Sequence, residues 1–378
     1  MNVKQEPQFN PKRLREARLV RGMTISDLAE KIGISKQAIS QFELGEHSPK
    51  HETVLALINT LKFPKNFFYR EFKEQYVGNT FFRANATATK KSKEVQFQKT
   101  LLAGYIYEYL SEYIEFPELN VPDSSLCLNS EWNNNSIEQL AEQVRKHWDL
   151  GDKPITNIVH LLERNGVIVF SVDTDSEKVD AFCQHRKGRP FIFLGNDKQS
   201  AFRRQFDGAH ELGHILMHKE IDNQDVLSRI EFKEMENQAN RFASALLLPA
   251  EAFAKTVTST SLLHFVELKK YWNVSIAAML YRCLDLKLID ESKYTSLVKQ
   301  MSMKKMRTKE PLDDVFPLQE PVVLRKSILM LLENKIKNEL QLIQEISVPQ
   351  EYIEMLCNLD QGTLNYKEPE PTIRLIKR

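Results

Sequence analysis

The stretch His210-Glu211-Leu212-Gly213-His214 places two imidazoles four positions apart, with a carboxylate directly after the first. On an α-helix, residues four positions apart lie on one face, so both histidines can bind the same metal ion. Zinc accepts nitrogen and oxygen ligands, and a catalytic zinc site keeps one position open for water. Glu211 flanks this face, where it can take a proton from that water and pass it to a leaving amine. The stretch therefore predicts zinc-dependent hydrolysis of an amide bond, with Glu211 as the base.

A third protein ligand is expected in the segment that begins at Glu236 and ends at Pro249. Read as a helix, this segment aligns Glu236, Ala239 and Ala243 on one stripe. Small residues on the stripe would let this second helix approach the first one closely. Glu236 is therefore the best candidate for the third ligand.

Three other residues compete for that role, namely Glu231, Glu234 and His218. His218 lies one turn beyond His214, where it could be a distal ligand or a donor to a ligand. A third histidine, one more turn along the same helix, is hard to direct toward the same tetrahedrally coordinated ion. A polar residue whose charge suits the end of the helix is an equally good interpretation of His218.

The spacing of these residues continues through both segments. The positions are His210, Glu211 and His214, then Glu236, Ala239, Asn240 and Ala243, then Leu246 to Pro249. They resemble the signature of the ImmA/IrrE family of zinc metallopeptidases, an HExxH helix followed by Glu-x-x-Ala/Cys-Asn-x-x-Ala and Leu-Leu-x-Pro. The resemblance implies that His210, His214 and Glu236 bind Zn²⁺. It also implies that Glu211 is the catalytic base.

Near the N-terminus, glycines and a proline separate four short amphipathic helices. These helices are expected at residues 11–20, 24–32, 36–44 and 52–61. The second and third are joined by Gly33-Ile34-Ser35, which is the helix-turn-helix spacing. Glycine permits the tight turn, and Ser35 can cap the helix that follows.

The third of these helices is expected to project polar side chains that suit base edges and phosphates. They are Lys36, Gln37, Ser40 and Gln41. Nearby arginines would add a local excess of positive charge, which favours phosphate contacts. They are Arg13, Arg15, Arg18 and Arg21.

The pattern Arg-Leu-x-x-Ala-Arg at 13–18, followed by Leu-Ala-x-x-Ile-Gly-Ile-Ser-Lys-Gln-Ala-Ile-Ser-Gln-Phe-Glu-x-Gly at 28–45, extends over about fifty residues. It resembles the XRE (lambda-repressor-like) helix-turn-helix family. The resemblance implies that DNA is a partner of this region. It also implies that the four polar residues of the third helix contact bases and phosphates.

The middle of the chain begins with Phe81-Phe82-Arg83-Ala84, which resembles the Phe-Arg segment of fused XRE and ImmA/IrrE proteins. A helix is expected at residues 94–113. Ser136 and Gln139 form a capping box for a helix that runs to Trp148.

A sheet is predicted just before the HExxH helix. A helix at residues 155–165, ended by Gly166 in a left-handed cap, leads into three short β-rich runs at 167–172, 181–184 and 190–194. We expect these runs to form a small antiparallel sheet beside the HExxH helix, with an edge that could pair with an extended substrate.

The C-terminal part is predicted to be helical. Residues 262–272 and 276–286 repeat a helix-turn-helix spacing without a cationic surface, which favours a packing module over a second DNA reader. Helices are also expected at 322–343 and 352–359.

Length and composition agree with several soluble domains. The chain has 378 residues, 42% of them hydrophobic, which favours two or three domains. A net charge of +1 excludes a chain that is basic throughout but allows a local basic surface. Because an apolar signal core and long apolar runs are missing, we expect a cytoplasmic protein without a membrane partner. The scattered cysteines are expected to be reduced and mostly buried, and they are Cys127, Cys183, Cys283 and Cys357.

The expected fold is mainly α with an α+β zincin-like domain. We expect an all-α XRE-type helix-turn-helix domain at 1–70 and a helical linker region at 71–135. An ImmA/IrrE-like zinc metallopeptidase domain would follow at 136–255, and a helical C-terminal region at 256–378.

Two functions fit these features. The resemblance implies a DNA-binding transcriptional regulator whose zinc endopeptidase cleaves a repressor protein in phage, mobile-element or stress-response regulation. The alternative is a non-proteolytic XRE-type regulator or antitoxin that uses the zinc fold for sensing or partner binding. A homodimer is compatible with either function.

Overall fold

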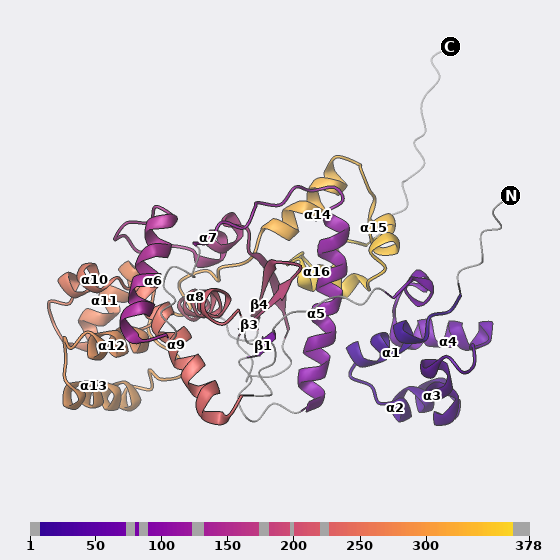
Figure 1. The fold of residues 1–378 in the computed structure, drawn as a ribbon, viewed down its shortest axis with the longest axis horizontal. Helices are drawn as coiled ribbons and strands as arrows, with labels where there is room; N and C mark the ends of the chain where they lie inside the picture. The colour runs from indigo at the N-terminus through magenta and orange to yellow at the C-terminus, as the bar shows by residue number, and fades with distance from the viewer. Residues whose placement is uncertain are drawn as a thin grey trace, which may run out of the picture. The chain divides into compact units, whose positions relative to one another are not determined.

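The computed structural model describes residues 8–72, 80–82, 90–122, 132–173, 181–196, 200–219 and 227–365 (Figure 1). Its contacts divide the chain into two units. The first contains Met1–Glu74, Thr89–Ile114 and Leu324–Arg378, and the second contains Gln75–Ala88 and Glu115–Val323. The expected fold class, mainly α with an α+β part, is confirmed. The division at residues 70, 135 and 255 that was made from the sequence remains a prediction.

The helix-turn-helix region begins the first unit. Its helices are α1 (Pro11–Val20), α2 (Ile25–Ile32), α3 (Lys36–Leu44) and α4 (His51–Leu61), followed by a 3₁₀ turn at Lys65–Tyr69. Gly33 ends α2 with a φ of 72°, and the Ser35 hydroxyl accepts a hydrogen bond from the amide of Ala38 at 3.1 Å. These are the turn and cap that the sequence predicts.

The rest of the first unit comes from distant parts of the sequence. It contains α5 (Lys90–Leu110), α14 (Val323–Glu333), α15 (Glu339–Ile346) and α16 (Gln350–Leu356). Arg21 donates to a carboxylate oxygen of Glu351 at 2.7 Å, and Arg70 donates to the carbonyl of Ile346 at 2.9 Å. The C-terminal segment therefore packs against the helix-turn-helix region.

Two helix predictions in this unit need correction. The helix expected at 94–113 begins four residues earlier and ends at Leu110. The single helix expected at 322–343 is two helices, because Lys335 has a φ of 55° and Asn338 caps α15 in a reciprocal pair with Gln341. Asparagine competes with helix continuation because its side chain binds nearby backbone amides.

The sheet of the second unit has the strand order β1-β3-β4-β2. Its strands are β1 (Thr80–Phe82), β2 (Ile168–Val172), β3 (Ala181–Arg186) and β4 (Arg189–Gly195). Of the Phe-Arg segment, Phe81 and Phe82 lie in β1, whereas Arg83 and Ala84 lie outside the described residues.

The expectation of an antiparallel sheet is correct for β3 and β4 and wrong for β2, which pairs parallel to β4. The strand β1, which pairs antiparallel to β3, was not predicted. Lys187 and Gly188, with φ of 48° and 80°, join β3 to β4 in a tight hairpin. The hairpin returns β4 between β3 and β2. Since β3 runs opposite to β2, β4 must run parallel to β2.

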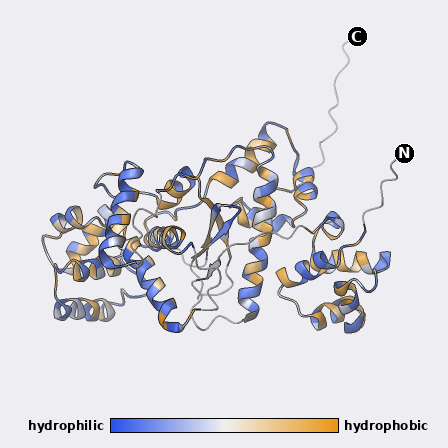
Figure 2. Cartoon of the chain, viewed as in Figure 1, coloured by the Kyte–Doolittle hydropathy of each residue, from blue (hydrophilic) through white to orange (hydrophobic). Residues whose placement is uncertain are grey.

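Helices of the second unit pack around this sheet and around one another. They are α6 (Asn134–His147), α7 (Ile158–Arg164), α8 (Ala201–Met217), α9 (Arg229–Leu247), α10 (Ala250–Thr256), α11 (Leu262–Trp272), α12 (Ile276–Asp285) and α13 (Glu291–Met303). Many of them combine hydrophilic and hydrophobic residues, as amphipathic helices do (Figure 2). α11 and α12 contribute to the same hydrophobic core as α8 and α9, which supports the packing-module interpretation.

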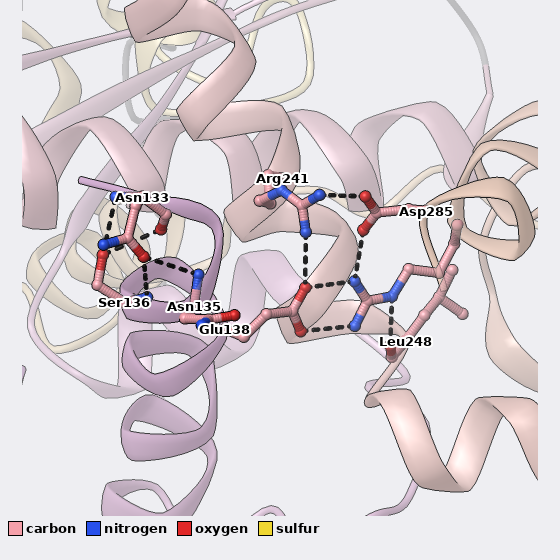
Figure 3. A network of polar contacts seen from close by, with 8 residues as sticks. Asn133, Asn135, Ser136, Glu138, Arg241, Leu248 and Asp285 are labelled. Atoms are coloured by element: carbon pink, nitrogen blue, oxygen red, sulfur yellow. Dashed lines mark hydrogen bonds and ion pairs between the residues drawn. The ribbon is translucent and has the colours of Figure 1, made fainter. Parts of the chain in front are cut away.

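The first turn of α6 corrects the predicted capping box. Asn133 is the cap, since its side-chain oxygen accepts from the amides of Asn135 and Ser136, and Ser136 Oγ accepts from the amide of Asn133 (Figure 3). Ser136 is thus the third residue of the helix instead of its cap. Asparagine caps helices at least as well as serine, so the upstream residue begins the helix.

A polar network joins α6, α9 and α12 (Figure 3). The Glu138 carboxylate accepts from Arg282 at 2.6 and 2.8 Å and from Arg241 at 3.2 Å. Arg282, with a fully buried side chain, also donates to Asp285 and to the carbonyl of Leu248. The network fixes α9, the helix that carries Glu236, against its neighbours.

Candidate metal centre and DNA-contacting helix

Helices α8 and α9 supply the candidate metal ligands, and each begins with a serine cap. Ser200 caps α8, and Ser228 caps α9 in a capping box with Glu231. Every residue of α8 except Arg203 and Phe206 is buried. The HExxH stretch therefore lies in the interior of the second unit.

The two helices meet where Gly213 faces α9. A Cβ atom added to Gly213 would lie 3.1 Å from Cδ1 of Phe242 and 3.3 Å from Cα of Ala239. Ala239 and Ala243 are both fully buried. Small residues on both helices thus permit the close approach that the sequence predicts.

His210, His214 and Glu236 come together across this contact. Their ligand atoms all lie within 4.8 Å of one another. The Nε2 atoms of the two histidines are 3.0 Å apart, and Glu236 oxygens lie 3.5 Å from Nε2 of His210 and 3.2 Å from Nε2 of His214. Burial raises the pKa of Glu236, but the hydrogen bonds and charges of the two histidines outweigh burial and lower it below its usual range.

The competing ligand candidates lie elsewhere. Glu231 is exposed, and its carboxylate accepts from the amide of Ser228 at 2.8 Å as part of the helix cap. Glu234 is exposed on α9. His218 forms the C-terminal cap of α8, and its Nδ1 lies 3.0 Å from Nδ1 of His214, on the side of that ring away from Glu236. Burial and then the charge of His214 lower the pKa of His218 to about 3, so its ring is neutral near neutral pH.

The chemistry of this donor set fits zinc. Nδ1 of His210 lies 3.0 Å from Oδ1 of Asn240. Because a carbonyl oxygen only accepts, this nitrogen carries the proton, and Nε2 presents its lone pair toward His214 and Glu236. Two imidazole nitrogens and one carboxylate form a three-ligand set typical of catalytic zinc, with a fourth position left for water.

Glu211, directly after His210 on α8, is fully buried, and its neighbour on the sheet is Cys183 of β3. Burial, then the charge of Glu211 and a hydrogen bond with it, raises the pKa of the Cys183 thiol well above its usual value. Cys183, Cys283 and Cys357 are free and buried, as expected, whereas Cys127 lies outside the described residues. The contact between Cys183 and Glu211 was missed because nothing in the sequence specifies which residue of β3 faces α8.

The candidate DNA-contacting residues lie together on α3. Lys36 and Gln37 are exposed, Ser40 and Gln41 are partly exposed, and Ile39 between them is fully buried. Within the described ranges, the side chains of these four polar residues make no hydrogen bond with the protein. They are therefore available to a partner.

Three of the arginines that were expected to add positive charge are held in ion pairs. Arg13 pairs with Glu16 at 2.8 Å, Arg18 with Glu43 at 2.6 Å, and Arg21 with Glu351 at 2.7 Å. The sequence pattern does not place these carboxylates beside the arginines, and a guanidinium group pairs readily with a carboxylate. Arg15 and Lys36 remain exposed.

Family models match both regions. Residues 14–68 match a helix-turn-helix model, and residues 162–284 match the Peptidase M78 model, described as an IrrE N-terminal-like domain. The chain fuses a helix-turn-helix domain to an IrrE N-terminal-like domain. The first match runs from α1 into the 3₁₀ turn, and the second includes β2 to β4, α8 and α9. The IrrE N-terminal-like domain is thus of the metallopeptidase type.

Similarities to known proteins beyond these models are weak. The fused chain is 16% identical to a Mycobacterium tuberculosis transcriptional regulator, covering 49% of this chain and 51% of that one with a TM-score of 0.29. It is 14% identical to Bacillus thuringiensis PlcR in complex with the peptide PapR7 and DNA, covering 78% and 92% with a TM-score of 0.15. No curated protein matches the chain. No helix in the described ranges combines the length and apolarity needed to span a bilayer.

Proposed function

We propose that this chain is a DNA-binding transcriptional regulator whose IrrE N-terminal-like domain is a zinc-dependent endopeptidase. The substrate would be a repressor protein in phage, mobile-element or stress-response regulation, and the reaction would take place in the cytoplasm. One observation carries the proposal: two buried imidazole nitrogens and a carboxylate converge within 4.8 Å, and the fully buried Glu211 directly follows one of these histidines on α8.

His210, His214 and Glu236 would hold the zinc ion. Zinc bound there supplies Lewis acidity toward a carbonyl oxygen and makes water a stronger acid. Asn240 keeps the His210 ring oriented through its 3.0 Å contact with Nδ1.

Glu211 would handle the protons. It accepts a proton from the attacking water and delivers it to the amide nitrogen as the carbon–nitrogen bond breaks. It directly follows His210 on a helix that is buried almost throughout, which restricts the movement of its carboxylate. Because Glu211 would transfer protons and would not bind the zinc ion, its replacement removes no metal ligand.

DNA binding would depend on α3. Lys36, Gln37, Ser40 and Gln41 present donors and acceptors that suit base edges and phosphates. The family match at residues 14–68 supports DNA as the partner of this domain.

The test is the release of fragments from candidate repressors by the purified full chain. Gln has nearly the size of Glu but cannot accept the proton, so Glu211→Gln is expected to retain zinc and lose cleavage by at least ~100-fold. Glu234→Gln, a change at an exposed carboxylate of α9, is the matched control and should cleave as the wild type does.

The alternative function predicts a different outcome. If a strain carrying Glu211→Gln regulated its target genes as the wild type does, hydrolysis would not be the mechanism. The non-proteolytic regulator or antitoxin would then be the better description.

A further inference from the structure

We propose that Gln238 and His218 form a hydrogen-bonded relay that fixes the tautomer and orientation of the metal ligand His214, so that its Nε2 presents a lone pair. This inference rests on the proposed zinc site and assigns a role to His218. Both residues would be positioning residues, because they act on the metal only through His214.

The relay begins at a main-chain carbonyl. Nε2 of Gln238 donates to the carbonyl oxygen of Trp132 at 3.3 Å. Trp132 is itself anchored, because its indole Nε1 donates to the carbonyl of Met217 at 3.0 Å, at the end of α8. A carbonyl only accepts, so the amide group of Gln238 is oriented with its NH₂ toward Trp132 and its Oε1 free to accept elsewhere.

The second residue of the relay is His218, which contacts the amide oxygen of Gln238. Oε1 of Gln238 lies 3.0 Å from Nε2 of His218. Since the oxygen accepts, Nε2 of His218 is the donor of this hydrogen bond, and Nδ1 is left to accept one.

His214 completes the relay. Its Nδ1 lies 3.0 Å from Nδ1 of His218, so one of these two nitrogens must donate. His218 has already placed its proton on Nε2, and His214 Nδ1 is therefore the donor. Nε2 of His214 is left with its lone pair, 3.2 Å from Glu236 and 3.0 Å from Nε2 of His210. This is the form of histidine that can bind zinc.

Burial protects the relay from exchange with water. His214 is 1% exposed and His218 is 4% exposed, so solvent offers little competition for these hydrogen bonds. Gln238 and Asn240 lie on α9 with Glu236, and Asn240 orients His210 directly. α9 would thus provide one ligand and the groups that orient the other two.

The first test measures the zinc dissociation constant of the full chain by competition with a chromophoric chelator. His218→Phe keeps a ring but removes both ring nitrogens. Gln238→Met keeps the length of the side chain but removes the amide oxygen and the amide nitrogen. Each is expected to weaken zinc binding by ~10–100-fold, the usual effect of losing an orienting partner of a ligand. His160→Phe changes an exposed histidine of the same unit and is expected to have no effect.

The double variant separates a relay from two independent structural effects. Because the two residues act in series, His218→Phe combined with Gln238→Met should bind zinc no more weakly than the weaker-binding single variant. Additive losses would overturn the relay, and so would wild-type affinity in His218→Phe. Either result overturns the relay alone, provided that the wild type binds zinc. If the wild type binds no zinc, the proposed function is overturned together with the relay.

A second measurement needs no variant. NMR spectra of nitrogen-labelled histidines in the zinc-loaded wild type report which ring nitrogen carries each proton. The relay requires a proton on Nδ1 of His214 and on Nε2 of His218. A proton on Nδ1 of His218 would overturn it.

Discussion

Helices α3 and α8 both carry candidate functional side chains, but in opposite environments. On α3, only Ile39 is fully buried, and the four candidate DNA-contacting residues are exposed or partly exposed. On α8, His210, Glu211 and His214 are each at most 1% exposed, and each is in contact with other side chains. The polar side chains of α3 are accessible to a partner, whereas the functional side chains of α8 are held in place by other side chains of the protein.

This difference has energetic consequences. Substitutions on an exposed helix face usually change folding free energy by less than about 0.5 kcal/mol, so their effects are confined to binding. Substitutions in a buried polar group remove partners that water cannot replace. The two regions should therefore respond differently to similar changes, which the following predictions use.

The largest effect is expected from removing a metal ligand. Glu236→Ala should reduce the zinc content of the full chain from about one per chain to almost none, with an affinity loss of more than ~100-fold, beyond that of an orienting partner. Metal analysis after dialysis measures it, with Glu231→Ala as the control. DNA affinity should stay unchanged. Full retention of zinc in Glu236→Ala would show that Glu236 is not the third ligand.

The buried network around Glu138 should be the next most sensitive. Arg282→Ala removes the closest partner of Glu138 and one of the two arginine partners of Asp285, whose side chains are 25% and 14% exposed. Loss of one member of such a buried pair destabilises by about 3–5 kcal/mol. Urea unfolding of the full chain measures the change, and Arg203→Ala, at an exposed position of α8, should be close to neutral. Equal stability of the two variants would show that the network is dispensable.

On α3, a single change should alter specificity and leave stability unaffected. Gln37→Ala is expected to relax the preference for one base pair by about 1–3 kcal/mol. Binding to operator variants selected by the wild type measures this preference, and thermal unfolding checks that the fold is intact. An unchanged base preference would remove Gln37 from the proposed contacts.

The smallest effect concerns salt dependence. Lys36→Gln should reduce the slope of log affinity against log salt by about 0.9, the value for one phosphate contact. Arg18→Gln should leave that slope unchanged, because Arg18 is already paired with Glu43 and is 7% exposed. A larger change of slope in Arg18→Gln than in Lys36→Gln would reverse the assignment of these two charges.

Local signals made the helix-turn-helix region predictable. The bounds of α1 and α3 agree with the sequence prediction, because Pro11, Gly33, Ser35 and Gly45 act on their immediate neighbours. The candidate metal residues were also readable, since helical spacing places His210 and His214 on one face. The meeting of these histidines with Glu236 followed from small residues at the helix contact.

Other features depend on contacts between distant residues and were not predictable. The parallel pairing of β2 follows from the position of the β3–β4 hairpin, and the pairing of β1 with β3 joins residues about 100 positions apart. The ion pairs of Arg18 and Arg21 also depend on tertiary partners. The contacts of His218 with Gln238 needed the crossing of α8 and α9, which spacing alone does not give.

The discontinuous first unit has a consequence for the order of events during synthesis. The ribosome produces the helix-turn-helix region and α5 early, but the partners of Arg21 and Arg70 on α15 and α16 come after about 200 intervening residues. At ~5–20 residues per second, this interval lasts roughly 10–40 s. Throughout it, the nascent chain exposes the surface around Arg21 and Phe63 that Tyr352 later contacts. The first unit is therefore complete only after its C-terminal segment has left the ribosome.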